Sequence, residues 1–125
     1  MTETKLTARL VKCWQQMGCE VINIHGNNFQ APGWPDVFVC SKNWTGFIEF
    51  KGPSTVTMPH QTRILARLEK SPCPACIVRF VNVQGELWSF TVERSSGEVV
   101  LKVAIAGTDG QVAAGLLREL AIFGV

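Results

Sequence analysis

The chain has 125 residues, of which 46% are hydrophobic and 18% carry a formal charge. This length and apolar content predict a single domain over residues 1–125 with its own core, and leave little room for a second domain. The formal net charge of +2 excludes a strongly basic nucleic-acid-binding tail, but it is compatible with a polyanionic partner.

Five cysteines occur in a chain whose first residues are polar and charged. An odd number of cysteines without a signal peptide is typical of a reducing compartment, and no apolar run reaches the length of a membrane span. We therefore expect a cytoplasmic protein with no membrane partner.

Residues 3–17 have the periodicity of an amphipathic helix, which Thr2 would cap and Gly18 would end. The residues expected on its apolar face are Leu6, Leu10, Trp14 and Met17. Glu3 falls on this apolar side too, which is an unusual place for a carboxylate.

The opposite face of the same helix carries Lys5, Arg9, Lys12 and Gln16. Such a basic stripe either follows the phosphates of a nucleic acid or simply meets water.

Three strands are expected next, over residues 19–25, 35–41 and 44–52, with a loop rich in Gly, Asn and Pro at 26–34. The short turn at residues 42–43 predicts that the second and third strands form an antiparallel hairpin. Their nearly continuous apolar residues predict burial on both faces.

A second helix is expected from Pro59 to about Lys70, with Gln61 on the same face as its core residues Ile64, Leu65 and Leu68. Arg63 and Arg67 lie opposite. Strands over residues 75–83, 86–93 and 98–106 and a helix over 109–122 complete the chain. The fold class is therefore α/β, with a mixed central sheet flanked by helices.

Two acids and a lysine interrupt the apolar hairpin. Side chains alternate along a strand, so Glu49 and Lys51 share one face while Phe50 points to the other. Antiparallel pairing brings Asp36 close to Glu49. Two neighbouring carboxylates repel each other unless a cation lies between them, and Mg²⁺ or Mn²⁺ with oxygen ligands fits that need.

The motif "GWPD" (residues 33–36), followed by "EFK" (49–51), resembles the PD-(D/E)xK nuclease superfamily. The longer stretches "NNFQAPGWPDVFV" and "GFIEFK", and a helix opening with "HQ", resemble its VRR-NUC branch. The resemblance implies a restriction-endonuclease-like αβββαβ core over about residues 3–81, with a C-terminal elaboration over about 84–125.

The same resemblance implies a role for each site residue. Asp36, Glu49 and the backbone carbonyl of Phe50 would be metal ligands, and Lys51 would position the attacking water. Gln61 matches a downstream glutamine of the branch. Glu3 matches an acid on the first helix and is a further candidate metal ligand.

The expected function is then that of a Mg²⁺- or Mn²⁺-dependent DNA endonuclease. The residues expected to contact DNA phosphates are Lys5, Arg9, Lys12, Arg63 and Arg67. Trp34 would either stack on a splayed base or be buried under its loop. Stand-alone relatives of phage-like origin suggest a four-way junction as substrate, hence a homodimer with residues 112–123 at its interface.

Three alternatives remain open. The hairpin residues could form a solvent-facing ion pair beside a turn capped by Asp36. The chain could be a non-catalytic nucleic-acid-binding or assembly module that keeps the nuclease fold. It could also be a nuclease that depends on a partner for targeting, because so small a domain has little surface for sequence readout.

Two further motifs are ambiguous. The "CPAC" segment places Cys73 and Cys76 at the spacing of half a zinc site, but no second paired motif exists, and two adjacent thiols in a reducing cell are the favoured interpretation. His60 and His25 could contact a phosphate or simply be solvated.

Overall fold

The computed structural model describes residues 2–24 and 32–125, apart from the side chains of residues 82 and 83. Its elements are α1 (Glu3–Gln16), β1 (Glu20–Asn23), β2 (Val37–Cys40), β3 (Thr45–Lys51), α2 (Pro59–Glu69), β4 (Ala75–Gln84), β5 (Leu87–Glu93), β6 (Val99–Ala106) and α3 (Asp109–Ile122). The predicted α/β class is confirmed, as is the order of helix, three strands, helix and strand with further strands and a helix after it. His25 and most of the predicted loop, residues 26–31, lie outside the described residues.

The six strands form one mixed sheet in the order β1-β2-β3-β4-β5-β6. The predicted hairpin is present, with Val37 opposite Ile48 and Cys40 opposite Thr45. Only β3 and β4 run parallel; the other neighbouring pairs in the sheet are antiparallel. A parallel pair needs a crossover connection, and α2 supplies it.

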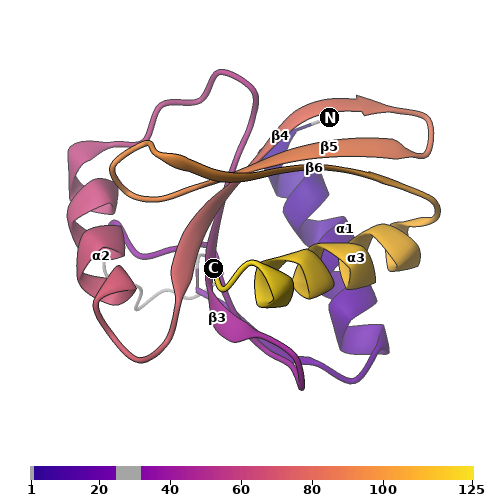
Figure 1. The fold of residues 1–125 in the computed structure, drawn as a ribbon, viewed down its shortest axis with the longest axis horizontal. Coiled ribbons are helices and arrows are strands. Elements are labelled where there is room, and N and C mark those ends of the chain that lie inside the picture. Colours follow the sequence, from indigo (N-terminus) through magenta and orange to yellow (C-terminus); the bar gives the residue numbers. More distant parts are fainter. Residues whose placement is uncertain (1, 25–31) are drawn as a thin grey trace.

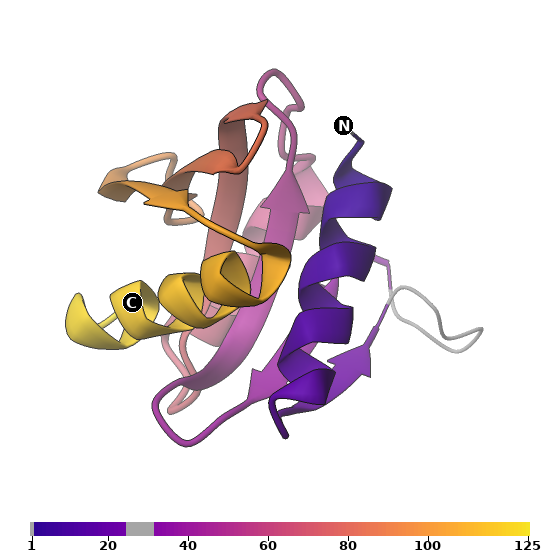
Figure 2. The same ribbon diagram turned by 90° about the vertical axis from the view of Figure 1, so that its right-hand side faces the viewer.

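The helices cover both faces of the sheet. Figure 1 places α2 on one side of the strands and α1 with α3 on the other, and Figure 2 shows α1 and α3 together in front of the sheet. Trp14 joins the layers on the α1 side, because its ring stacks on Phe50 at 6.2 Å and its indole Nε1 donates to the carbonyl of Ala113 at 2.9 Å. The α1 and α3 helices have 14 residues each, and no helix in the described segments combines the length and apolarity needed to cross a membrane.

Strand β3 is buried on both faces, as its apolar sequence predicts. Ile48 and Phe50 belong to the large core under α1 and α3. On the other face Phe47 packs against a smaller cluster that includes Leu65 of α2. Strand β2 differs from the prediction, because Val37 and Val39 are buried whereas the residues between and after them are more exposed.

Helix α1 follows the prediction closely. The Thr2 hydroxyl caps it by accepting from the Lys5 amide at 3.2 Å, and Leu6 and Leu10 are fully buried. Met17 is the exception on the predicted apolar face, since its side chain is 45% exposed. It stands one residue past the helix end, where the chain turns away through Gly18 at a φ of 91°.

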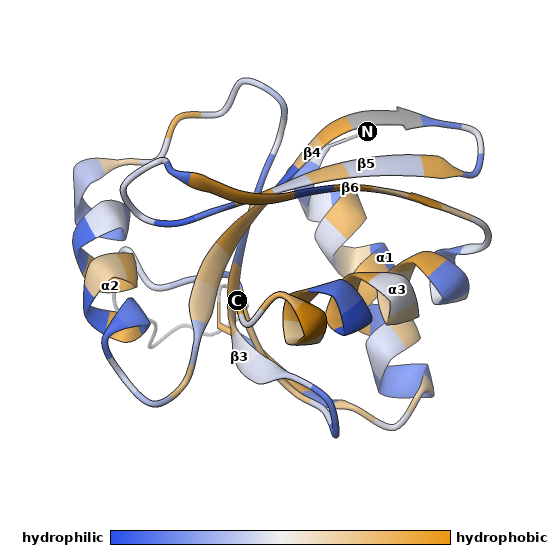
Figure 3. Ribbon diagram, viewed as in Figure 1, coloured by the Kyte–Doolittle hydropathy of each residue, from blue (hydrophilic) through white to orange (hydrophobic). Residues whose placement is uncertain are grey.

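Most apolar residues of α3 are buried in the core of the same chain. Its buried residues are Val112, Ala113, Gly115, Leu116, Leu117 and Leu120. Figure 3 shows that strongly polar positions alternate with apolar ones along this helix. Only Ile122 and Phe123, at the end, are large, apolar and exposed, at 65% and 57%. The predicted dimer interface over residues 112–123 therefore needs correction, because most of that apolar surface already packs on α1 and the sheet.

The position of α3 in the core predicts a contrast between two truncations. Leu116→Ala should lower the free energy of unfolding by about 2–5 kcal/mol, because it leaves a cavity at a fully buried site. Ile122→Ala, at an exposed site on the same helix, should change it by less than about 0.5 kcal/mol. Urea denaturation at two protein concentrations measures both values. A loss for Ile122→Ala that grows on dilution would instead indicate a subunit interface.

Candidate functional site

A pocket of about 320 Å³ lies where β1 ends, β2 begins and β3 ends, with the first turns of α1 beside it. Its lining residues are Glu3, Thr4, Thr7, Ala8, Asn23, Asp36, Glu49, Lys51 and Gln61. The lining includes all five side chains predicted to be catalytic: Glu3, Asp36, Glu49, Lys51 and Gln61. The fold thus gathers residues from α1, α2 and the hairpin into one place.

The hairpin register positions the two acids. The β2–β3 ladder ends with Val37 opposite Ile48, so Asp36 and Glu49 are the next residues along the two segments. Asp36 Oδ2 accepts a hydrogen bond from the Phe50 amide at 2.7 Å, and its carbonyl accepts from the Ile24 amide at 2.8 Å. The Asp36 carboxylate is thereby held against β3.

Glu49, Lys51 and Gln61 form a buried polar network. Lys51 Nζ lies 3.2 Å from Glu49 Oε2, and the two side chains are only 6% and 4% exposed. Gln61 bridges them, because its Nε2 donates to Glu49 Oε2 at 3.1 Å and its Oε1 accepts from Lys51 Nζ at 3.1 Å. The alternative of a solvent-facing ion pair is therefore wrong for these residues.

The network also fixes the start of α2. Gln61 Oε1 accepts a second hydrogen bond, from the Met58 amide at 3.0 Å, so this side chain caps its own helix while it contacts the site. Pro59 follows Met58 as the first helical residue, where its missing N–H costs nothing. The start of helix α2 thus places Gln61 against Glu49 and Lys51 of β3.

The glycine of "GWPD" permits a close approach to α2. Gly33 has a φ of 91°, and a Cβ built on it would lie 2.9 Å from both the carbonyl oxygen and the imidazole Cδ2 of His60. His60 is half-buried there and is not among the described residues that line the pocket. Trp34 is also half-buried, with its ring edge against Phe47 at 5.9 Å. This contact favours packing over base stacking for Trp34.

Glu3 reaches from α1 to the loop after β3. Its Oε1 accepts from the Gly52 amide at 3.1 Å and from the Thr55 hydroxyl. Glu3 therefore lines the pocket as predicted, and in addition it holds the segment that leads from Lys51 to α2. A helix dipole also favours a carboxylate in this first turn.

The basic stripe of α1 is divided. Lys5 and Lys12 are exposed. At about 100° per residue, they lie on the helix surface next to Ala8, which lines the pocket. Arg9 is turned toward α3, where its Nε donates to Asp109 Oδ2 at 2.9 Å and its guanidinium lies 4.9 Å from the Trp88 ring centre. The hydrogen bond to Asp109 raises the pKa of Arg9. Arg9 thus already has a structural role.

The basic residues of α2 lie farther from the pocket. Arg63 and Arg67 are exposed, on the helix face opposite Gln61 and Leu65. Any contact that they make with a nucleic acid would be on the outer surface of α2 rather than in the pocket.

Four lining residues escaped the sequence analysis: Thr4, Thr7, Ala8 and Asn23. Asn23 pairs with Val37 and so stands beside Asp36 at the end of β1. Its polarity at the end of an alternating strand was a usable signal, but only the register of β1 on β2 places it in the site. The threonines and the alanine are ordinary residues of an exposed helix face and carry no signal.

The five side chains named by the resemblance lie in one pocket. No protein-family model and no curated protein matches this chain. The nuclease assignment therefore depends on the motif and on the arrangement of the pocket residues.

The donor set suits a hard cation with few protein ligands. No group of three or more His, Cys, Asp or Glu side chains arranged to hold a metal occurs in the described ranges 2–24 and 32–125. Three carboxylates line the pocket, those of Glu3, Asp36 and Glu49, and that of Glu3 already accepts hydrogen bonds from Gly52 and Thr55. Mg²⁺ is commonly bound by one or two carboxylates and keeps several waters, whereas zinc needs more protein ligands. The residues present thus fit Mg²⁺ or Mn²⁺.

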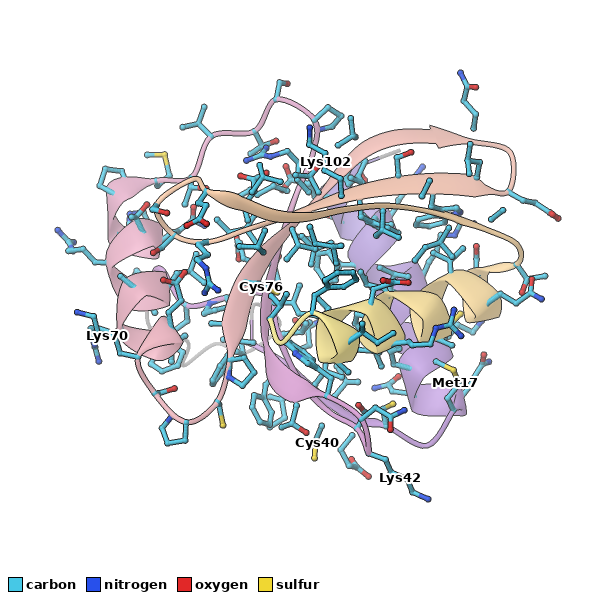
Figure 4. The ribbon with its side chains drawn as sticks, viewed as in Figure 1. Met17, Cys40, Lys42, Lys70, Cys76 and Lys102 are labelled. Carbon is cyan, nitrogen blue, oxygen red and sulfur yellow. The ribbon has the colours of Figure 1, made fainter. Side chains whose placement is uncertain are left out.

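Within the described residues, the CPAC cysteines are not part of a group of three or more metal-ligating side chains. Cys76 is buried in the core under α1 and α3, and burial raises the pKa of its thiol to about 12. All five cysteines are free. In Figure 4 Cys76 lies in the middle of the molecule and Cys40 at its edge.

This burial predicts selective thiol chemistry. Because Cys76 is buried, which raises the pKa of its thiol and blocks reagent access, N-ethylmaleimide at pH 8 should modify exposed Cys40 and leave Cys76 unmodified in the native protein. Cys40 shares its tryptic peptide with Cys13 and Cys19, and Cys76 shares its peptide with Cys73, so tandem mass spectrometry is needed to locate each label. Protein unfolded in guanidinium chloride is the control in which all five react. Equal native rates at Cys40 and Cys76 would contradict the buried position.

Proposed function

We propose that this protein is a metal-dependent DNA endonuclease of the PD-(D/E)xK type. The observation that carries the proposal is the buried network of Glu49, Lys51 and Gln61 in one pocket with Asp36. Burying a charged pair has a large desolvation cost, and removing such groups from water is typical of catalytic sites. A purely structural role would be met as well by apolar residues of similar size.

In this proposal each pocket residue has a chemical task. Asp36 and Glu49, with the carbonyl of Phe50, would hold Mg²⁺ or Mn²⁺. The bound ion supplies an activated water and stabilises the charge that develops on the phosphate. Lys51 orients the attacking water through its ammonium group, which Gln61 keeps in place by accepting from Nζ at 3.1 Å.

The substrate proposed is branched DNA, with a four-way junction first. The exposed lysines Lys5 and Lys12 stand on the side of α1 next to the pocket and would contact phosphates. Two symmetrical cuts in a junction require two active sites, so the proposal includes a homodimer. Its interface cannot be the buried face of α3 and has to use other surface.

The proposal predicts metal-dependent cleavage that needs specific residues. Labelled four-way junctions incubated with the protein and Mn²⁺ or Mg²⁺ should be nicked, and EDTA should abolish nicking. Asp36→Asn and Lys51→Met should each lower the single-turnover rate by at least about 100-fold, because they remove a metal ligand and an electrostatic group from the site.

A matched lysine provides the control. Lys42 lies in the turn at the other end of the β2–β3 hairpin, at the edge of the molecule in Figure 4. Lys42→Met should cleave at the wild-type rate. Junction binding without cleavage in either metal would contradict the nuclease and favour the non-catalytic binding module. Cleavage that appears only with added host extract would favour a partner-targeted nuclease.

A further inference from the structure

Arg79 is a half-buried cation outside the predicted motif. It lies on β4 in register with Lys51, its neighbour on the parallel strand β3. Side chains at paired positions of neighbouring strands point to the same face of a sheet, so Arg79 extends along the face that carries the site. Its side chain is 17% exposed, and that of its partner Glu93 is 11% exposed.

The guanidinium binds two parts of the chain at once. Nη1 donates to the carbonyls of Gly52 and Thr55, both at 2.7 Å. Nε donates to Glu93 Oε2 at 2.7 Å and Nη2 to Glu93 Oε1 at 3.4 Å. Glu93 thus neutralises Arg79 and fixes its plane, while Nη1 holds the loop that follows Lys51.

Glu3 binds the same two loop residues through other groups. It accepts from the Gly52 amide and from the Thr55 hydroxyl, whereas Arg79 donates to the carbonyls of these residues. We call the loop of residues 52–58, held in this way, the clamped loop. It connects Lys51 at the end of β3 to Pro59 at the start of α2. The amide of its last residue, Met58, donates to Gln61.

We infer that Arg79, oriented by Glu93, is a positioning residue for the site: it fixes the clamped loop and through it the places of Lys51 and Gln61 beside Glu49. Arg79 is not among the described residues that line the pocket, so it acts through its neighbours and does not contact the substrate. This inference rests on the proposed nuclease function for its effect on rate, but the structural link itself can be tested without cleavage.

The geometry is specific to arginine. A planar guanidinium donates to two carbonyls and a carboxylate at the same time, whereas an ammonium is a point charge with no fixed fork. Arg79→Lys keeps the charge opposite Glu93 and loses the fork. It therefore separates loop positioning from simple charge compensation.

The first readout is hydrogen–deuterium exchange followed by NMR, which does not depend on activity. In Arg79→Lys the amides of Gly52 and Met58, which donate to Glu3 and Gln61, should exchange at least about tenfold faster than in the wild type. Core amides of Ile48 and Val78 should keep their protection. Arg118→Lys, on the exposed face of α3, is the matched control and should alter neither set.

The second readout is kinetic. Arg79→Lys should lower kcat on the DNA substrate by about 10- to 100-fold with KM nearly unchanged, since groups that orient the residues of a metal site have effects of this size. Glu93→Gln should also lower kcat, because Glu93 orients the Arg79 guanidinium.

The outcomes distinguish the two proposals. If Arg79→Lys speeds loop exchange but even the wild-type protein cleaves no DNA, the clamp is upheld and the nuclease is overturned. Wild-type loop exchange and wild-type kcat in a folded Arg79→Lys protein would overturn the clamp. An equal increase in exchange over the whole sheet would also overturn it, since Arg79 would then serve general stability.

Discussion

The buried ion pair of Glu49 and Lys51 is the constraint around which this end of the fold is arranged. Two charged side chains that are 4% and 6% exposed need hydrogen bonds to offset their desolvation. Gln61 supplies two, and it is available only because α2 begins at Pro59 with its first turn against β3. The crossover between the parallel strands β3 and β4 is therefore both a topological necessity and the source of the third polar group.

The core on the other face of the sheet gives this network a rigid base. Phe50 stands between Glu49 and Lys51 in the sequence and packs on Trp14, so the same strand is anchored by apolar contacts on one face and carries charges on the other. Trp14 in turn donates to Ala113 of α3, which ties the C-terminal helix to the site-bearing strand. The C-terminal third thus stabilises the platform rather than forming a separate unit.

Much of this arrangement could be predicted from the sequence, because it depends on local patterns. The alternation in β3 and the short turn before it predict which side chains of the hairpin meet, and helical spacing predicts that Gln61 faces the core. Contacts between distant elements could not be predicted in this way. Arg9 turns to Asp109, Asn23 joins the pocket, and Arg79 binds the loop after Lys51, all through pairings that depend on packing of whole elements. The burial of most apolar residues of α3 could not be predicted for the same reason, since an apolar helix face does not reveal whether it packs within its own chain.

A crystal structure of the protein soaked in Mn²⁺ would show whether Asp36 and Glu49 bind a divalent cation together, as we propose. Anomalous scattering would locate the ion independently of any assay. We expect one strong peak in the pocket, about 2.0–2.4 Å from a carboxylate oxygen of each residue. A well-occupied peak elsewhere, or none at millimolar Mn²⁺ in a crystal whose pocket is open to solvent, would contradict the proposal.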